Sequence, residues 1–413
     1  MSESAKVDRD VVGLERSAPP TWLDAARCEA VAAAEPSPFP PEEHAQRLRR
    51  VRELMAEEGM AALLVCRPSS IEYLCGYHSA ETAPQPLLVT QDATYLYVPD
   101  LEIGRALASS RAGTILYYGY AQAHKARTLV AEHTARVLGS DPRLGVESAH
   151  ASTPPEMLEL LRAQELRLVA GGQLVERVRL VLSPAEIECV EAAAAATHSG
   201  VQGAVEAARE PGATDSSLAA AIARRLFESA TAPSAWGPVV ATGSRGGIPH
   251  SSWKDNPIDG GATFLEFAGA HHRYHAPVMR TLCRGRPSAD ARRLADLATA
   301  ALDAVLRTAR AGIPCSEVAR QARAATGPLP DDVVFHSLYG YPVGLAHPPH
   351  WMDTAPFYIT EDNPEPLREG MVFHMPGSFR SFGSLGVGLS QTFAIEAHGT
   401  RVLTRGPAEL IEV

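Results

Sequence analysis

Residues 264–281 read FLEFAGAHHRYHAPVMRT, and this stretch decides the fold of the C-terminal half of the chain. Its two apolar runs, separated by a short polar segment, predict β-strands over residues 263–270 and 274–279. Strands that follow each other this closely favour pairing as an antiparallel hairpin.

Glu266 is the charged residue of the first predicted strand. Side chains alternate between the two faces of a strand, so Glu266 projects away from the side that Leu265 and Phe267 share. A carboxylate in an apolar strand requires either a solvent-facing side or a polar pocket, and both interpretations stay open. Pairing with the second strand is expected to set Glu266 near Arg280.

A helix start lies upstream of the hairpin, at Ser183-Pro184-Ala185-Glu186. A serine N-cap, a proline at the first helical position and a glutamate three residues after the cap form a capping box. A long Ala-rich helix is expected to follow to about residue 208 and to begin a second domain. Further helices are expected over 215–229 and 288–310, and further strands over 239–242, 371–375, 387–396 and 401–404. Long helices with irregular strands indicate an α+β domain.

The N-terminal half alternates between helical and strand patterns. Helices are expected over 42–59, 126–138 and 154–161, and strands over 61–66, 87–90, 94–98, 114–118, 144–146 and 166–169. This alternation predicts an α/β domain over residues 41–182, followed by the second domain over 183–413. Residues 1–40 are expected to form a proline-rich N-terminal arm with a short helix at about 22–34.

Composition argues against several classes of protein. The 413 residues suggest two or three domains, and 45% hydrophobic with 21% charged residues is ordinary globular usage. The net charge of −10 argues against nucleic acid and anionic membranes as partners but permits a small cationic ligand. Six cysteines form no CxxC pair, and neither a signal peptide nor a membrane span is expected. We therefore expect a cytoplasmic protein with reduced thiols.

Histidines gather in the second half of the chain and offer another kind of candidate. Most are expected to be surface or hydrogen-bonded core residues. His250 ends the segment GSRGGIPH, which lacks the features of a phosphate loop and is better interpreted as a flexible turn that presents this imidazole. A rebuilt zinc site through His250, His347 and His374 stays open, because three histidines can hold zinc.

The order and spacing of several motifs resemble the creatinase/prolidase/aminopeptidase P superfamily. The motifs are IEYLCGY at residues 71–77, SPAEI at 183–187, His250, AG at 268–269, RT at 280–281 and EGMVF at 369–373. The resemblance covers roughly residues 40–413 and implies a creatinase-like α/β N-terminal domain and an α+β pita-bread C-terminal domain. It also implies a homodimer.

The metallopeptidases of this superfamily bind two metal ions through two Asp, one His and two Glu. At the corresponding positions this chain has Glu266, Pro277, Tyr341, Met375 and either Ser390 or Gln391. Proline and methionine cannot replace hard oxygen ligands of a divalent ion. The resemblance therefore implies neither the dinuclear metal site nor a cofactor.

Within the superfamily, the chain resembles the metal-independent ectoine hydrolase branch. The shared segments are EFAG at 266–269, RYH at 273–275, GYPVG at 340–344, PPHW at 348–351 and FHMPG at 373–377. The departures are His347, where a tyrosine is expected, and Gln391, where a glutamate is expected. Loss of an acidic group changes which cation fits the pocket. The resemblance therefore indicates the class of reaction better than it indicates the substrate.

The resemblance implies a hydrolase that opens a C–N bond of a small cyclic amidine or guanidine-like amino-acid derivative. Glu266 is the expected nucleophile or general base, and His250 is the expected acid/base. The expected substrate-binding residues are Tyr341, His374, Arg280, His347, Trp351 and Gln391. Open alternatives are a Xaa-Pro peptidase-like metalloenzyme with a rebuilt histidine site, a biosynthetic enzyme acting on a related metabolite, and a non-catalytic binding protein.

Overall fold

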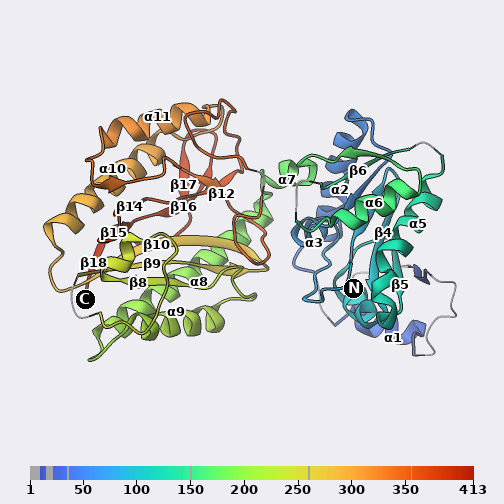
Figure 1. The fold of residues 1–413 in the computed structure, drawn as a ribbon, viewed down its shortest axis with the longest axis horizontal. Coiled ribbons are helices and arrows are strands. Elements are labelled where there is room, and N and C mark those ends of the chain that lie inside the picture. Colours follow the sequence, from blue (N-terminus) through green and yellow to red (C-terminus); the bar gives the residue numbers. More distant parts are fainter. Residues whose placement is uncertain are drawn as a thin grey trace, which may run out of the picture. The chain divides into compact units, whose positions relative to one another are not determined.

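A computed structural model describes residues 10–14, 22–34, 37–140, 142–148, 151–258, 261–354 and 356–413. The chain divides into two compact units, Met1–Val178 and Arg179–Val413 (Figure 1). Of the proline-rich arm expected over residues 1–40, Pro19, Pro20 and Pro36 lie outside the described residues.

The first unit is built on a mixed sheet with the strand order β1-β5-β4-β3-β2-β6-β7. The strands are β1 (Asp10–Gly13), β2 (Ala62–Val65), β3 (Leu87–Thr90), β4 (Thr94–Pro99), β5 (Thr114–Tyr118), β6 (Arg143–Val146) and β7 (Arg167–Ala170). The helices are α1 (Ala25–Ala32), α2 (Pro41–Glu57), α3 (Pro68–Cys75), η1 (Asp100–Glu102), α4 (Ile103–Ser109), η2 (Tyr120–Lys125), α5 (Ala126–Leu138), α6 (Pro155–Ala163) and α7 (Leu174–Arg179). β3 pairs antiparallel with both β2 and β4, and the other neighbours are parallel.

The core of the first unit lies between this sheet and its helices. Leu64 and Tyr97 of the strands pack in one apolar cluster with Val130 of α5 and Met157 of α6. This arrangement confirms the α/β class expected for the N-terminal half. β1 was not expected, because its residues DVVG lie in the segment that the sequence assigns to the N-terminal arm.

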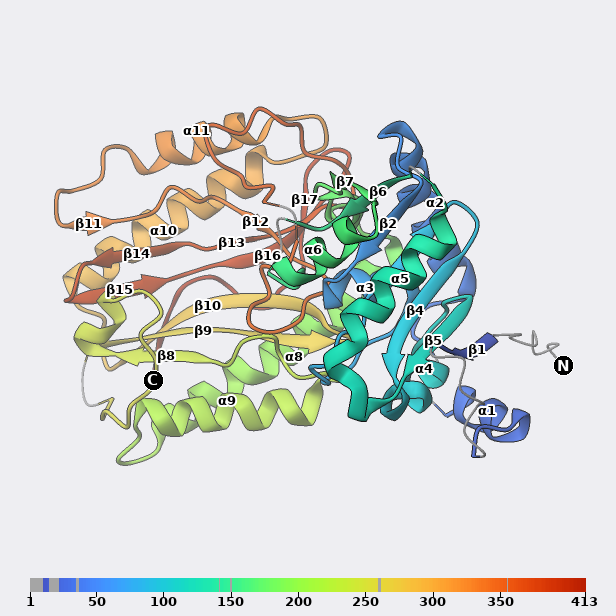
Figure 2. The same cartoon turned by 45° about the vertical axis from the view of Figure 1, so that its right-hand side comes forward.

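In the second unit, two long helices cover one face of a sheet with the strand order β18-β10-β9-β8 (Figures 1 and 2). The elements are α8 (Pro184–Arg209), α9 (Asp215–Ser229), β8 (Val239–Thr242), β9 (Gly261–His271), β10 (Tyr274–Arg284) and β18 (Leu410–Glu412). The expected capping box begins α8: the Glu186 N–H donates to Ser183 Oγ at 3.3 Å, and the Ser183 N–H donates to Glu186 Oε2 at 2.8 Å.

The hairpin of β9 and β10 has the predicted pairing but not the expected neighbours. Glu266 stands opposite Met279, and Leu265 stands opposite Arg280. Directly opposed residues share a face, whereas consecutive residues face opposite sides. Glu266 and Arg280 therefore start from opposite faces of the hairpin, and the expectation that this pairing sets them together is wrong.

The other face of the β8–β9–β10 layer is covered by short strands, and helices α10 and α11 pack against those strands in turn (Figure 2). The elements are η3 (Gly243–Gly247), α10 (Ala289–Thr308), α11 (Cys315–Thr326), β11 (Val333–Val334), β12 (Tyr341–Pro342), β13 (Val372–Met375), β14 (Ser378–Ser381), β15 (Leu385–Gly388), β16 (Gln391–Ile395) and β17 (Thr400–Val402). The strands form two sheets, ordered β11-β14-β15 and β12-β13-β16-β17. This is the α+β architecture expected for the C-terminal half.

The single strand expected over residues 387–396 is wrong, because this stretch contains the end of β15 and all of β16, in different sheets. Gly388 lies so close to β9 that a Cβ atom there would stand 2.4 Å from Phe264 Cε2. Two residues later, Ser390 Oγ accepts a hydrogen bond from the Met279 N–H at 2.6 Å. The chain is thus bound to the central hairpin at the point where it passes between the two sheets.

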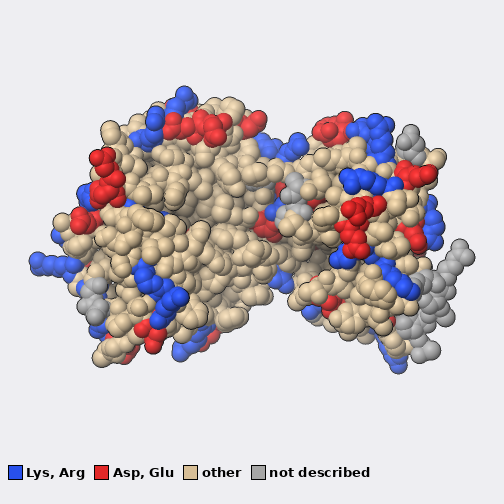
Figure 3. All heavy atoms as spheres, viewed as in Figure 1, with Lys and Arg blue, Asp and Glu red and all other residues tan. Residues whose placement is uncertain are grey.

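Charged side chains of both signs are interspersed over the face seen in Figure 3, without a broad patch of one sign. In the second unit they lie mostly toward the periphery of that view (Figure 3). Among the described residues, no helix combines the length and the apolar character needed to cross a membrane.

Candidate functional site

Glu266 is a buried carboxylate without a hydrogen-bond partner among the described residues. It lies in the middle of β9, and the residue is 5% exposed. Burial raises the pKa of the Glu266 carboxyl to about 7, while the positive charge of Arg380 on β14 acts against that rise. A carboxylate held in this way near neutral pH is suited to accept a proton or to meet a cationic ligand.

Beside Glu266 lies a hydrogen-bonded chain of four side chains from separate parts of the second unit. The indole N–H of Trp351 donates to Tyr341 Oη at 2.9 Å. Tyr341 Oη lies 2.7 Å from Nδ1 of His374, and Nε2 of His374 lies 2.7 Å from Ser390 Oγ. Tyr341 and His374 face each other across β12 and β13, which explains how the register brings them together.

The donors and acceptors in this chain depend on which ring nitrogen of His374 carries its proton. With the proton on Nδ1, His374 donates to Tyr341 Oη, and the Ser390 O–H donates to Nε2 while Ser390 Oγ accepts the Met279 N–H. In this tautomer Tyr341 Oη accepts from both Trp351 and His374, and its own phenolic proton is left to donate elsewhere. With the proton on Nε2, the Tyr341 hydroxyl donates to His374 instead.

The electrostatics of these groups indicate their charge states. Burial, followed by the charges of Arg280 and His350, lowers the pKa of His374 to about 3, so its imidazole is neutral. Burial and the nearby Glu266 carboxyl raise the pKa of Tyr341 well above its usual value, so its phenol stays protonated. Tyr341 is therefore a neutral proton donor within the electrostatic reach of Glu266.

His250 lies at the exposed end of an aromatic cluster. The ring centroids of His250 and Trp236 are 5.4 Å apart, and Trp236 also stands 4.6 Å from His350 and 5.1 Å from Trp351. His250 has a positive φ of 58°, and its side chain is exposed. Burial of part of the ring and the charges of Arg380 and His336 lower the pKa of His250, which favours the neutral imidazole.

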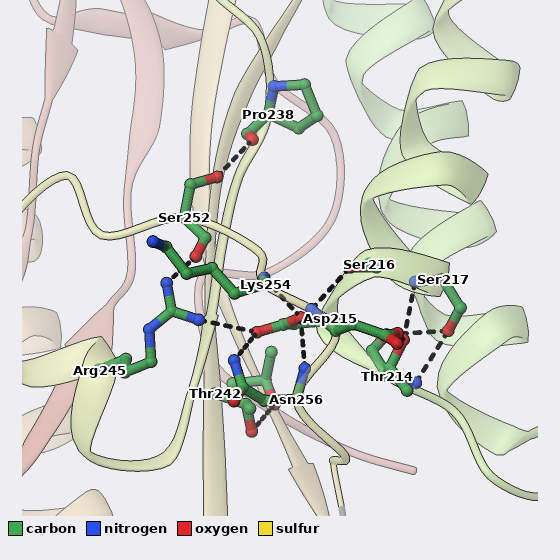
Figure 4. A network of polar contacts seen from close by, with 12 residues as sticks. Thr214, Asp215, Ser216, Ser217, Pro238, Thr242, Arg245, Ser252, Lys254 and Asn256 are labelled. Atoms are coloured by element: carbon green, nitrogen blue, oxygen red, sulfur yellow. Dashed lines mark hydrogen bonds and ion pairs between the residues drawn. The ribbon is translucent and has the colours of Figure 1, made fainter.

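The loop that carries His250 is attached to α9 through Asp215 (Figure 4). Oδ1 of Asp215 accepts the N–H groups of Lys254 and Asn256, each at 3.0 Å. Oδ2 accepts from Asn256 Nδ2 at 3.0 Å and from Arg245 Nη1 at 3.2 Å. Arg245 also donates to the Ser252 carbonyl, so both ends of the segment around His250 are bound to one buried carboxylate.

We expect the Asp215→Asn variant to be less stable by about 3 kcal/mol, because a neutral amide leaves the Arg245 charge without its partner inside the loop. Urea unfolding measures this difference. The exposed Asp290→Asn variant is the control and should unfold like the wild type. Equal stability of Asp215→Asn and the wild type would mean that this network contributes nothing to holding the loop.

Arg280 and Gln391 are joined to each other and to backbone carbonyls. Arg280 Nη1 donates to the carbonyls of Ser390 at 2.7 Å and Met279 at 2.8 Å, and Nη2 lies 3.4 Å from Gln391 Oε1. Gln391 Nε2 donates to the Gly406 carbonyl at 3.0 Å. The structure thus places both side chains in a cross-link between β10 and β16; their expected contact with a substrate remains a prediction.

The expected site residues fall into three places. Glu266, Tyr341, His374 and Trp351 come together, and His250 joins them through the Trp236 cluster. Arg280 and Gln391 form the neighbouring cross-link. His347 lies near His275, and its N–H donates to the carboxylate of Asp353 at 3.1 Å.

Three residues beside this site were not predicted from the sequence: Trp236, His350 and Arg380. Ser390 was expected only as a position corresponding to a metal ligand, not as a hydrogen-bond partner of His374. His350 stands inside the PPHW segment, which was the one signal available for it. Arg380 occurs in SFRSFG, a segment without any recognisable motif. Its position beside Glu266 depends on how β14 crosses the central hairpin, which is a tertiary feature.

The side chains at the positions that the sequence resemblance aligns with metal ligands do not fit a dinuclear metal site. Glu266 is the carboxylate of this set, whereas Pro277 and Met375 have no side-chain oxygen and Tyr341 Oη is held by Trp351 and His374. A rebuilt site is no better supported, because both ring nitrogens of His374 are engaged by Tyr341 and Ser390. Within the described ranges, no group of three or more His, Cys, Asp or Glu residues is arranged to hold a metal ion.

Two family models account for most of the chain. Residues 188–397 match metallopeptidase family M24, and residues 47–181 match the creatinase/prolidase N-terminal domain. The chain therefore belongs to metallopeptidase family M24, with the creatinase-like and pita-bread domains that the sequence predicted. It is a hydrolase of this family.

The matches to individual relatives cover nearly the whole length of each relative. The chain is 27% identical over 398 residues to the ectoine hydrolase of Halomonas elongata, covering 90% of this chain and 98% of that protein. It is 24% identical over 374 residues to the Xaa-Pro dipeptidase of Pyrococcus horikoshii, covering 89% and 99%. The structure of dipeptidase PepE from Mycobacterium ulcerans matches with a TM-score of 0.77 at 22% identity, covering 91% of this chain and 99% of that one.

Proposed function

We propose that this protein hydrolyses a C–N bond of a small cyclic amidine or guanidine-like amino-acid derivative without a metal ion. One observation carries the proposal: Glu266 is a buried carboxylate without a hydrogen-bond partner among the described residues. The sequence resemblance aligns this position with a metal ligand of the metallopeptidases. The side chains at the other ligand positions, Pro277 and Met375 among them, do not suit a metal ion.

A cationic substrate follows from the needs of the reaction. A peptide carbonyl is neutral and weakly electrophilic, and a metallopeptidase activates it with the charge of its metal ions. An amidinium or guanidinium group brings its own positive charge to the carbon that must be attacked. That charge also compensates the buried Glu266 carboxylate, which otherwise has no cation in direct contact.

The chemical step uses groups that are already in place. In one route, Glu266 removes a proton from water while the water oxygen bonds to the amidine carbon; in the other, a Glu266 oxygen bonds to that carbon and water later hydrolyses the resulting ester. In either route the C–N bond breaks, and the departing nitrogen receives a proton. Tyr341 is the proposed proton donor, because its phenol is neutral and, with His374 protonated on Nδ1, its proton is not used by Trp351 or His374.

His250 and the aromatic cluster complete the proposed assignment. His250 is proposed to exchange protons with solvent, so that Tyr341 regains the proton given to the departing nitrogen and Glu266 ends the cycle ionised; the exposed ring and lowered pKa of His250 suit a neutral proton acceptor. Trp236 and Trp351 offer aromatic faces, which attract a delocalised cation. His374 orients the Tyr341 hydroxyl through its hydrogen bond.

Similarity to the ectoine hydrolase of Halomonas elongata supports ring opening of a cyclic amidine. Similarity to the Xaa-Pro dipeptidase of Pyrococcus horikoshii keeps a peptidase as the second candidate. A panel of ectoine, hydroxyectoine, creatine and Xaa-Pro dipeptides, followed by mass spectrometry, separates the two functions. Cleavage confined to the dipeptides would overturn the proposal.

Activity is expected to survive removal of metal. After dialysis against a chelator, the purified protein should contain no stoichiometric metal by elemental analysis and should keep its initial rate of amidine hydrolysis. The reason is the donor set, since Pro277, Met375 and the engaged Tyr341 offer no pair of metal sites. Loss of activity together with one or two equivalents of metal, and recovery when the metal is returned, would contradict this prediction.

A further inference from the structure

Arg380 is a buried cation whose hydrogen-bonding capacity is largely unused. The residue is 6% exposed, and its Nε–H donates to the Gly246 carbonyl at 3.3 Å. Its guanidinium carbon lies 4.9 Å from the centre of the Phe264 ring. No described residue accepts a hydrogen bond from its two Nη groups, which leaves four N–H donors without a protein partner.

Arg380 and Glu266 influence each other without forming a direct ion pair. The Phe264 ring beneath Arg380 is two residues from Glu266 on the same face of β9, and the charge of each group favours the ionised form of the other. Neither makes a hydrogen bond or salt bridge to the other among the described contacts. A buried charge without a direct partner destabilises the folded protein. A ligand with one positive and one negative group could compensate both Glu266 and Arg380.

The guanidinium group of Arg380 lies over the Phe264 ring in a cation–π contact. The Nη edge of a guanidinium group presents a fork of donors. Such a fork matches the two oxygens of a carboxylate in a bidentate arrangement. The Gly246 carbonyl holds the Nε side of the same group, so the Nη side is the one left for a ligand.

Arg280, which the sequence suggested for this role, is occupied elsewhere. Its guanidinium donates to the carbonyls of Met279, Ser390 and Gly406 and to Gln391. A substrate carboxylate would have to replace several of these contacts to reach it. Arg380 could bind a carboxylate through its Nη groups without giving up a hydrogen bond to the protein.

From these contacts we propose that Arg380 binds the carboxylate of the substrate while Glu266 faces its cationic amidine or guanidine group. The substrate class is then a zwitterion: an amino-acid derivative with a free carboxylate and a cyclic or open amidinium. This inference rests on the proposed hydrolysis and names the residue that holds the substrate carboxylate. A cationic ring without the carboxylate would lose the interaction with Arg380.

The test compares ectoine with 2-methyl-1,4,5,6-tetrahydropyrimidine, which has the same ring without the carboxylate. The wild type should show kcat/KM about 30-fold higher for ectoine, as expected for loss of a charge-assisted bidentate contact. Arg380→Gln should lower kcat/KM for ectoine about 30-fold, mainly through KM, and leave the carboxylate-free ring unaffected. Arg380→Lys should recover only part of the loss, because an ammonium cannot stack or bind in a bidentate way.

The exposed Arg320→Gln variant on α11 is the control and should behave as the wild type. If the wild type opens both rings at equal rates, or if Arg380→Gln slows both equally, the inference fails and the proposed hydrolysis stands. If the wild type opens neither ring yet binds ectoine in calorimetry, with binding lost in Arg380→Gln, the hydrolysis fails and the inference stands. Absence of both turnover and binding overturns both.

Discussion

Replacement of Glu266 by Gln is expected to lower kcat for amidine hydrolysis by about 10⁴-fold. Gln keeps the size of the side chain, but it cannot accept a proton from water or form an ester with the amidine carbon. It also removes the negative charge that compensates the cationic substrate in a buried position. Initial rates of ring opening, followed by mass spectrometry, measure the loss.

Glu147 offers a matched control in the first unit. Like Glu266, it is a buried glutamate whose pKa is raised to about 7, chiefly by burial. It accepts hydrogen bonds from the N–H groups of Cys66 and Arg67 and lies far along the chain from β9. Glu147→Gln should keep near wild-type kcat. Full activity of Glu266→Gln in a folded protein would exclude Glu266 from the chemistry.

The Glu266→Gln substitution is expected to stabilise the protein at alkaline pH. The pKa of Glu266 is raised from its usual 4.5 to about 7 in the folded state, so ionisation costs more after folding than before. Its contribution to stability is therefore lost as the pH rises from 4.5 through 7. Above pH 7, Glu266→Gln should exceed the wild type in unfolding free energy by an amount on the order of 3 kcal/mol.

Urea unfolding at pH 5 and pH 8 tests this linkage. The difference between Glu266→Gln and the wild type should be small at pH 5 and should grow toward pH 8. A difference that is the same at both values would show that Glu266 ionises as it does in the unfolded chain. Lower activity together with higher stability would mark Glu266 as a residue kept for function.

Replacement of Tyr341 by Phe is expected to lower kcat by about 10²-fold. The change removes the proton proposed to reach the departing nitrogen, and it leaves the Trp351 indole N–H and the His374 ring without their partner. The kcat effect should exceed the KM effect, because the proton is needed as the C–N bond breaks.

Tyr339→Phe is the matched control for Tyr341. Tyr339 is equally buried and lies two residues away, but its hydroxyl makes no hydrogen bond with a described residue. Its substitution should leave kcat unchanged. If Tyr341→Phe keeps full kcat with the unfolding free energy lowered, the hydroxyl is structural and another group supplies the proton.

Local patterns predicted most of the elements because their signals are complete within short stretches. The capping box at Ser183 and Glu186 requires four consecutive residues, and α8 begins there as predicted. The β9–β10 hairpin followed from two adjacent apolar runs. The split of the predicted strand at Leu389 and Ser390 was not visible, because it results from close contact of Gly388 with Phe264.

Residues of the candidate site were predicted where they belong to a sequence motif. They were missed where only the tertiary structure brings them to the site. Glu266, Tyr341 and His374 belong to motifs with a recognisable order, and the structure brings them together. The expected meeting of Glu266 with Arg280 failed, because cross-strand register places Met279 opposite Glu266. Arg380 takes the neighbouring position from a different sheet, and no spacing in the sequence indicates that approach.

The most direct test of the central claim uses metal-depleted wild-type protein and ectoine, with Glu266→Gln in parallel. Mass spectrometry follows formation of a product that is heavier than the substrate by one water. We predict that the wild type forms this product without added metal, and that Glu266→Gln does not. The contradicting result is that ectoine, hydroxyectoine and creatine all remain intact while an added divalent metal ion enables cleavage of a Xaa-Pro dipeptide.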